Sequence, residues 1–295
     1  MLNKNLDGKG FNEIFIVIGM LILASGWAAV TATYIAGSLG GYVEKTVSSS
    51  LLGAVVLWVF AEYFIRRRRM IAPAIALSLL WAANAGTGII AFFSEPFMVA
   101  QNDLSSLPLP MALTTAAVAL FWFRFRVPFA MALIALGVFA LTLMMAAEQA
   151  GRPDGISDFF LFSASGPFAW VTLAVGIAVF AVAMMFDLSD PHRVTRRAAQ
   201  GFWLHVVAAP ALVNTIALSL LDSGTSGAQL TLVAVLLGFA LVAIVIDRRS
   251  FLIAAIGYSV TLAGTVFDGE GAAMTILLLG FFLVILGAFW ARIRA

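Results

Sequence analysis

Hydrophobic residues in this chain fall into about ten long runs, which are separated by short polar or basic gaps. The runs lie at roughly 14–36, 48–65, 70–93, 108–123, 127–148, 162–186, 201–221, 228–246, 250–267 and 272–290. A helix needs about 20 mostly apolar residues to cross the hydrocarbon core of a bilayer. The pattern therefore predicts an all-α fold, a polytopic transmembrane bundle of about ten helices that forms one integral membrane domain over residues 1–295. The fourth run is short, and the 94–107 segment before it could be interfacial or partly re-entrant.

Positive charge is concentrated in the gaps that follow every second run. These gaps hold Arg66, Arg67, Arg68 and Arg69, then Arg124 and Arg126, then Arg193, Arg196 and Arg197, then Arg248 and Arg249, and finally Arg292 and Arg294. Cytoplasmic loops of membrane proteins are enriched in Lys and Arg. With a cytoplasmic N-terminus, Lys4, Lys9 and all thirteen of these arginines lie inside, and only Lys45 and Arg152 lie outside. The chain is thus predicted to have both termini in the cytoplasm.

The composition fits this class of protein and excludes several others. The chain is 62% hydrophobic and 11% charged, with a mean hydropathy of +1.04. A soluble domain of 295 residues with so few charges could not solvate its surface. No cysteine and only two histidines are present, which excludes disulfides and thiolate chemistry and predicts no catalytic residue, no metal site and no cofactor.

The expected partner is the lipid bilayer, with anionic lipids at the cytoplasmic arginines. Nucleic acid is not an expected partner, because the basic residues lie at membrane edges and not on one soluble face. The first run is expected to remain as a helix and not to act as a cleaved signal peptide. It is longer than a typical signal sequence, and Asp7 and Glu13 precede or begin it.

Glu62 is the one carboxylate well inside a predicted span, and charges there are costly and often functional. It precedes Arg66 by four residues, a spacing that places both side chains on one helix face near the interface. Two interpretations follow. Glu62 is either a paired acid that reaches the interface or a carboxylate that couples proton movement to transport.

The 201–221 run carries His205, Pro210 and Asn214. His205 could relay protons near neutral pH, or donate one hydrogen bond to a neighbouring helix. Pro210 lacks a backbone donor, so carbonyls around 204–208 must be satisfied by protein, water or ligand. Asn214 follows Pro210 by one turn on the same face. We interpret these residues as the lining of a cavity, with Asn84 of the third run opposite; Asn84 could instead bridge two helices.

The polar segment from Asp187 to Arg197 allows two interpretations. Asp190 before Pro191 is typical of the N-cap of a short interfacial helix. Asp187, Asp190 and His192 also have the ligand atoms and close spacing of a divalent-cation site, which is the weaker interpretation.

The chain also shows weak internal similarity. Helical-hairpin repeats fit around 50–93, 108–148 and 228–267, since each contains a basic turn followed by small and branched residues. Convergence on arginine in the turns and alanine in the helices explains the same similarity without duplication. A division into halves at 1–150 and 151–295 would place five spans in each. Because five is an odd number of crossings, the second half would then have the opposite orientation in the membrane to the first.

Five segments carry a resemblance to a known group. They are Met185-Phe-Asp-Leu-Ser-Asp-Pro-His-Arg-Val-Thr-Arg-Arg, Phe202-Trp-Leu-His-Val-Val-Ala-Ala-Pro, Ile246-Asp-Arg-Arg, Asn12-Glu-Ile-Phe-Ile-Val-Ile-Gly and Phe123-Arg-Phe-Arg-Val-Pro-Phe-Ala. The chain resembles a group of uncharacterised polytopic inner-membrane proteins of proteobacteria, which implies the inner membrane of a bacterium but no established activity. In size and span number it is also similar to the drug/metabolite transporter superfamily; no motif matches, so this analogy concerns the fold alone.

The sequence leads to one function hypothesis and two alternatives. The first is a secondary transporter or permease for a small metabolite or lipid-like molecule, whose identity the sequence does not indicate. The second is a structural or accessory membrane protein with no small-molecule cycle, in which the buried polar residues bond helix to helix. An intramembrane enzyme ranks third, because the chain offers only His192 and His205 as imidazoles.

Overall fold

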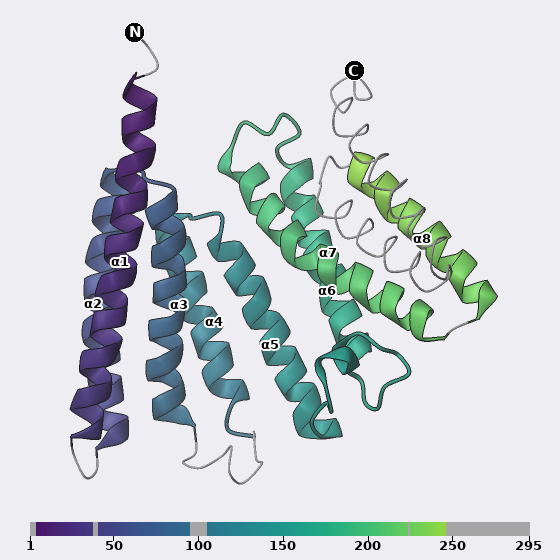
Figure 1. The fold of residues 1–295 in the computed structure, drawn as a ribbon, viewed down its shortest axis with the longest axis horizontal. Helices are drawn as coiled ribbons and strands as arrows, with labels where there is room; N and C mark the ends of the chain where they lie inside the picture. The colour runs from purple at the N-terminus through teal and green to yellow at the C-terminus, as the bar shows by residue number, and fades with distance from the viewer. Residues whose placement is uncertain (1–3, 38–40, 95–104, 224, 246–295) are drawn as a thin grey trace, which may run out of the picture. The chain divides into compact units, whose positions relative to one another are not determined.

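The computed structural model describes residues 4–37, 41–94, 105–223 and 225–245. Within these ranges the chain folds into eight α-helices and two short helical segments, with no strand (Figure 1). The helices are α1 (Lys4–Ala36), α2 (Tyr42–Ala61), the π-helix η1 (Glu62–Arg67), α3 (Ala72–Phe93), α4 (Pro108–Phe125), α5 (Ala130–Ala150), the 3-10 helix η2 (Ile156–Phe159), α6 (Phe168–Leu188), α7 (Arg196–Asp222) and α8 (Ser226–Val245). The predicted all-α fold is confirmed for this part of the chain.

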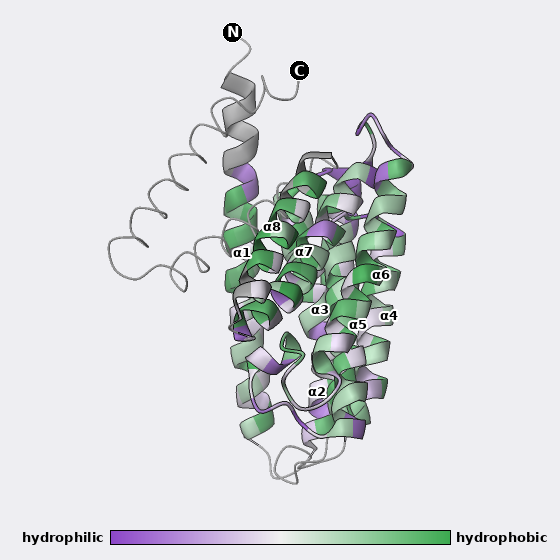
Figure 2. Ribbon diagram, turned by 90° about the vertical axis from the view of Figure 1, so that its right-hand side faces the viewer, coloured by the Kyte–Doolittle hydropathy of each residue, from purple (hydrophilic) through white to green (hydrophobic). Residues whose placement is uncertain are grey.

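Seven of the described helices are long and apolar enough to cross a membrane, and they coincide with the first seven predicted runs. The helix α8 covers most of the eighth run. The runs at 250–267 and 272–290, and most of the 94–107 segment, lie outside the described residues. Hydrophobic residues predominate along the helices (Figure 2). Many of the large ones, such as Leu51 and Phe123, are exposed. Exposed apolar faces over this length are typical of helices that contact lipid.

The chain divides into two compact units, each with its own internal contacts. Unit 1 comprises residues 1–152 and 183–204, and unit 2 comprises residues 153–182 and 205–295.

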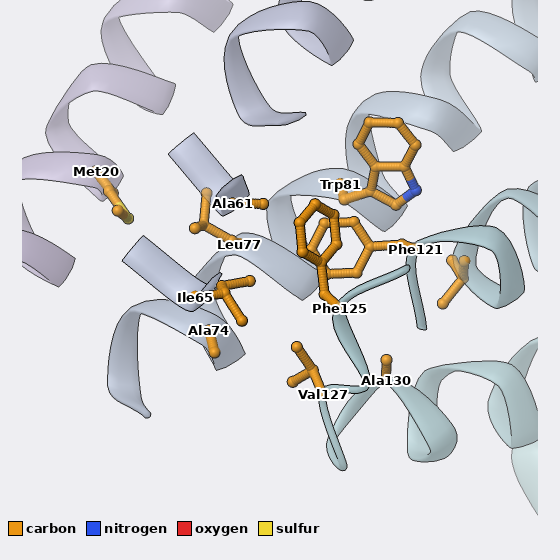
Figure 3. Packing of buried hydrophobic residues seen from close by; sticks show 11 residues of the cluster. Met20, Ala61, Ile65, Ala74, Leu77, Trp81, Phe121, Phe125, Val127 and Ala130 are labelled. Carbon is orange, nitrogen blue, oxygen red and sulfur yellow. The ribbon is translucent and has the colours of Figure 1, made fainter. Parts of the chain in front are cut away.

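The core of unit 1 is an aromatic cluster between α2, α3 and α4. The rings of Trp81 and Phe121 stack with centroids 5.5 Å apart, and Phe125 lies 4.6 Å from Phe121 (Figure 3). Trp58 closes the cluster at 5.3 Å from Trp81. The Trp81 indole N–H donates to the Ala117 carbonyl at 2.9 Å, so its one polar atom is satisfied inside the bundle.

Glycines allow the helices of unit 1 to approach closely. A Cβ added to Gly88 of α3 would lie 2.6 Å from Ser50 Cβ on α2. A Cβ on Gly137 of α5 would overlap the Thr115 side chain of α4. Small residues opposite hydroxyl-bearing ones are typical of packed membrane helices, because close backbones gain van der Waals contact.

Two short basic turns join the helices of unit 1 at one end. The helix α2 continues into the π-helix η1, which ends at Arg67, and Arg69 then adopts a left-handed backbone with φ 56°. The turn between α4 and α5 contains Arg126 in the same conformation, with φ 52°. Glu13 of α1 caps the N-terminus of α3. Its carboxylate accepts hydrogen bonds from Ile71 N at 3.2 Å and from Ala72 N at 3.0 Å. These N–H groups have no partner within their own helix.

In unit 2, α6 and α7 pack through Gly176, where an added Cβ would meet Ala211 and Leu212 at 3.2 and 3.1 Å. The segment before α6 is tied to the end of α7. The Ser219 hydroxyl donates to the Phe160 carbonyl and accepts from Phe162 N, both at 3.0 Å. These bonds give partners to a backbone N–H and a backbone carbonyl of the irregular segment, which are not paired within a helix.

Candidate functional site

The helix α7 is the most buried of the seven candidate spans. Half of its most apolar stretch is buried, against at most a third in any of the others. It is also the helix that holds the predicted residues His205, Pro210 and Asn214. Polar groups are costly at membrane depth, so their presence on the most enclosed span makes α7 the candidate site.

His205 is fully buried and lies nine residues after the start of α7. At a rise of about 1.5 Å per residue, His205 lies roughly 13 Å along the helix axis from Arg196. The ring of Phe180 on α6 meets the imidazole edge to face, with centroids 5.4 Å apart. Ala208 and Ala209 beside it are also fully buried. The imidazole therefore lies against the Phe180 ring of α6, on a buried face of α7.

Pro210 does not interrupt α7, which continues from Arg196 to Asp222. Its side chain is exposed. The carbonyl that loses its helical donor is that of Val206, four residues earlier, and Val206 is half-buried. The open carbonyl therefore lies toward the less enclosed side of α7.

Asn214 is half-buried and follows Pro210 by four residues, so it occupies the same face as Pro210, as predicted. It follows His205 by nine residues. At about 100° per residue, nine residues correspond to two and a half turns, which places the two side chains on opposite faces of α7. Helix periodicity thus directs His205 and Asn214 to different faces of α7. Their role in lining a cavity stays a prediction.

Asn84 bridges two helices of unit 1. Its side-chain amide donates to the Ser50 carbonyl of α2 at 2.8 Å. Its carbonyl oxygen lies against Gly53, where an added Cβ would be only 2.5 Å away. This geometry supports the interpretation of Asn84 as a helix bridge, since both ends of the amide face α2. Asn84 belongs to unit 1 and Asn214 to unit 2, so its placement opposite α7 stays a prediction.

Glu62 is paired with two arginines. Its Oε2 lies 3.2 Å from Arg66 Nη1, which confirms the predicted pairing at four residues' spacing. Its Oε1 lies 2.6 Å from Arg124 Nη2 at the end of α4. The Arg124 contact was not predicted, because it joins two helices that only the folded chain brings together. Each carboxylate oxygen of Glu62 therefore has a cationic partner, as expected of a structural acid.

Asp190 organises the turn between α6 and α7. Its carboxylate accepts from the Thr195 hydroxyl at 2.7 Å, from Thr195 N at 2.9 Å and from Val194 N at 3.2 Å. These bonds, first of all that from the Thr195 hydroxyl, lower the pKa of the Asp190 carboxyl from its ordinary value. The Thr195 hydroxyl accepts in turn from Arg197 N at 3.2 Å, in the first turn of α7.

The predicted short interfacial helix after Asp190 is wrong. Residues 190–195 form an irregular turn, and α7 begins at Arg196. The Asp190 carboxylate stabilises this turn and not a helix, because its two oxygens accept hydrogen bonds from the amides and the hydroxyl of residues four and five positions ahead. Among the residues that the structure describes, no three His, Asp or Glu side chains gather as metal ligands.

No family model, no curated protein and no solved structure matches this chain. The resemblance to polytopic inner-membrane proteins of proteobacteria, and the analogy to the drug/metabolite transporters, therefore stay predictions.

Proposed function

We propose that this protein is a multi-pass transporter of a small metabolite or lipid-like molecule, in the inner membrane of a bacterium. The distribution of its arginines favours ten spans with both termini in the cytoplasm. The observation that carries the proposal is the burial of His205 inside α7, the most enclosed of the candidate spans. An ionisable side chain at that depth is costly to a membrane protein and is a functional candidate for that reason.

In this proposal the solute moves beside α7, and the His205 imidazole is the group that accepts and donates the proton. Proton relays in transporters use such residues. The phenyl ring of Phe180 limits the approach to the imidazole from α6. In this proposal Asn84 and Glu62 hold the helices of unit 1 together, Asn84 through its bond to the Ser50 carbonyl and Glu62 through its two arginine partners.

A test of the path does not require the substrate. The chain contains no cysteine, so single cysteines can be introduced without background labelling. Ala209→Cys lies one turn from His205 on the same face, and Asn214→Cys lies on the opposite face. A charged thiol reagent that cannot cross the membrane is added from either side of sealed vesicles. Ser223→Cys, at the exposed end of α7, is the reactive control, and Leu21→Cys, on the apolar exposed face of α1, is the unreactive one.

We expect Ala209→Cys to react, because transport requires water to reach the His205 face from at least one side. Reaction at Asn214→Cys alone would place the path on the other face of α7 and remove His205 from it. No reaction at either position, with Ser223→Cys labelled normally, would refute the transporter proposal.

A structural or accessory role is the second candidate. It is favoured by Asn84, whose side-chain amide bonds α3 to α2. This candidate predicts a dry interior along α7. The same labelling experiment distinguishes the two functions, since a protein without a solute path leaves both Ala209→Cys and Asn214→Cys unreactive.

A further inference from the structure

One end of unit 1 gathers three of the arginine clusters. The clusters are Arg66 to Arg69, Arg124 with Arg126, and Arg193 with Arg196 and Arg197. The bond between Glu62 and Arg124 joins the first two turns. The ring of Phe129 meets Trp203 at 4.7 Å and joins the third cluster to the second. We call this end the basic end.

The carboxylates of the basic end are already engaged by the protein. Glu62 binds Arg66 and Arg124, Glu13 caps α3, and Asp190 accepts hydrogen bonds within its own turn. The fourth acid, Asp187, lies against Gly201 of α7 and also has a partner within the protein. Arg68 is held as well, because both its Nε and one terminal nitrogen donate to the Tyr63 hydroxyl, at 3.1 and 3.0 Å. The basic end therefore carries more positive charge than its own acids neutralise.

Two arginines of the first turn extend from the protein. Arg67 and Arg69 are exposed, and neither forms an ion pair with any residue in the described part of the chain. Arg126 of the second turn is also exposed. Its guanidinium lies over the rings of Trp122 and Phe123, 4.7 and 4.8 Å from their centroids. Aromatic rings and arginines side by side are typical of the interface between lipid tails and headgroups.

The backbone of these turns is unusual for arginine. In the described part of the chain, the non-glycine residues with a left-handed backbone are Arg69, Arg126 and Arg193, with φ of 56°, 52° and 55°. Each belongs to a different cluster of the basic end. Glycine adopts this conformation without the steric conflict that a Cβ introduces. At each of these three turns, arginine thus occupies a left-handed position that glycine would adopt with less strain.

We propose that the basic end binds the phosphates of anionic glycerophospholipids, with Arg67, Arg69 and Arg126 as the contacts. Guanidinium groups bind phosphate oxygens in pairs, through two parallel hydrogen bonds. An anionic leaflet also attracts exposed basic residues next to a span. The site is independent of the transport path, since it involves neither α7 beyond its first turn nor His205.

The test uses the full chain in lipid nanodiscs made of phosphatidylcholine alone or of phosphatidylcholine with phosphatidylglycerol. We expect the midpoint of thermal unfolding to be higher in the anionic discs. The double variant Arg67→Gln/Arg69→Gln should lose most of that increase. The matched double variant Lys45→Gln/Arg152→Gln removes two positive charges outside the basic end and should keep it. Equal loss in the two doubles, or no increase for the unmodified protein, would overturn the proposal.

A second pair of substitutions separates the side chain from its backbone. Arg69→Gly/Arg126→Gly keeps the left-handed turns and removes the guanidinium groups. We expect its midpoint in phosphatidylcholine to be unchanged or higher, while the increase in anionic discs is lost; retention of that increase would overturn the assignment of these arginines. Inorganic phosphate added to phosphatidylcholine discs should not reproduce the increase. If it does, the site binds soluble anions and the lipid proposal is wrong.

Discussion

Replacing Gly88 with alanine tests whether the close contact between α2 and α3 holds unit 1 together. The added Cβ would lie 2.6 Å from the Ser50 Cβ and 3.0 Å from its hydroxyl oxygen. Carbon atoms in contact normally lie about 3.5–4.0 Å apart. The two helices must separate by roughly 1 Å, because neither the new methyl group nor the Ser50 Cβ can rotate away.

The expected cost follows from two opposing effects. Forcing an extra methyl group into a packed interface typically costs about 1–3 kcal/mol. Alanine is favoured over glycine in a helix by about 0.5–1 kcal/mol, which offsets part of that cost. We expect Gly88→Ala to lower the free energy of unfolding by about 1–2 kcal/mol. Equilibrium unfolding of the purified protein in detergent micelles measures the difference.

Two controls isolate the contact from the glycine itself. Gly26→Ala adds the same methyl group to α1, where nothing lies within 4 Å of it, and should be neutral or stabilising. Ser50→Gly in the Gly88→Ala background removes the opposing Cβ and should recover part of the loss, the rest being offset by the cost of a glycine in α2, while Asn84 keeps its bond to the residue-50 carbonyl. If Gly88→Ala behaves like Gly26→Ala, or if Ser50→Gly gives no recovery, the reasoning about this interface is refuted.

Three further predictions concern the polar contacts. Glu62→Gln should lower the free energy of unfolding by roughly 1 kcal/mol or less, since its partners are partly exposed, and the loss should shrink in high salt; a loss that is independent of salt would contradict the ion-pair role. Asn84→Ala should cost about 0.5–1.5 kcal/mol in the same unfolding measurement, and an unchanged stability would contradict its role as a helix bridge. Because folding lowers the pKa of Asp190, its charge stabilises the protein above its ordinary pKa, near 3.8, and this contribution disappears as the pH falls through the lowered value. Asp190→Asn should therefore reduce the thermal midpoint at neutral pH and approach the unmodified protein in acid, whereas a gap of constant size would show that ionisation is not involved.

The helices could be predicted from the sequence because the signal is strong and local. An apolar run either reaches the length of a membrane crossing or does not, so the first seven runs correspond to α1 through α7. The pairing of Glu62 with Arg66 was likewise local, since helix geometry fixes which residues at four positions' spacing meet. Its second partner, Arg124, depends on how α2 and α4 pack.

The residues that could not be predicted are those whose partners lie far along the chain. Glu13 was noticed only as an acid before an apolar run, yet it caps α3. A carboxylate at the start of a span is the available signal, but the sequence does not indicate which helix it meets. His205 and Asn214 show a different limit. Both were identified as polar residues of one span, and only the structure shows that His205 is fully buried while Asn214 is half-buried.

The cap that Glu13 places on α3 has a consequence for the order in which the protein is made. Its carboxylate binds amides 58 and 59 residues further along the chain. Synthesis at about 5–20 residues per second delivers those amides roughly 3–12 s after Glu13. Throughout that interval α1 has a charged group whose partner does not yet exist. Glu13 lies at the edge of its span, where water can solvate the carboxylate during that interval. The cap is therefore a late contact, which forms only after the first three helices have been made.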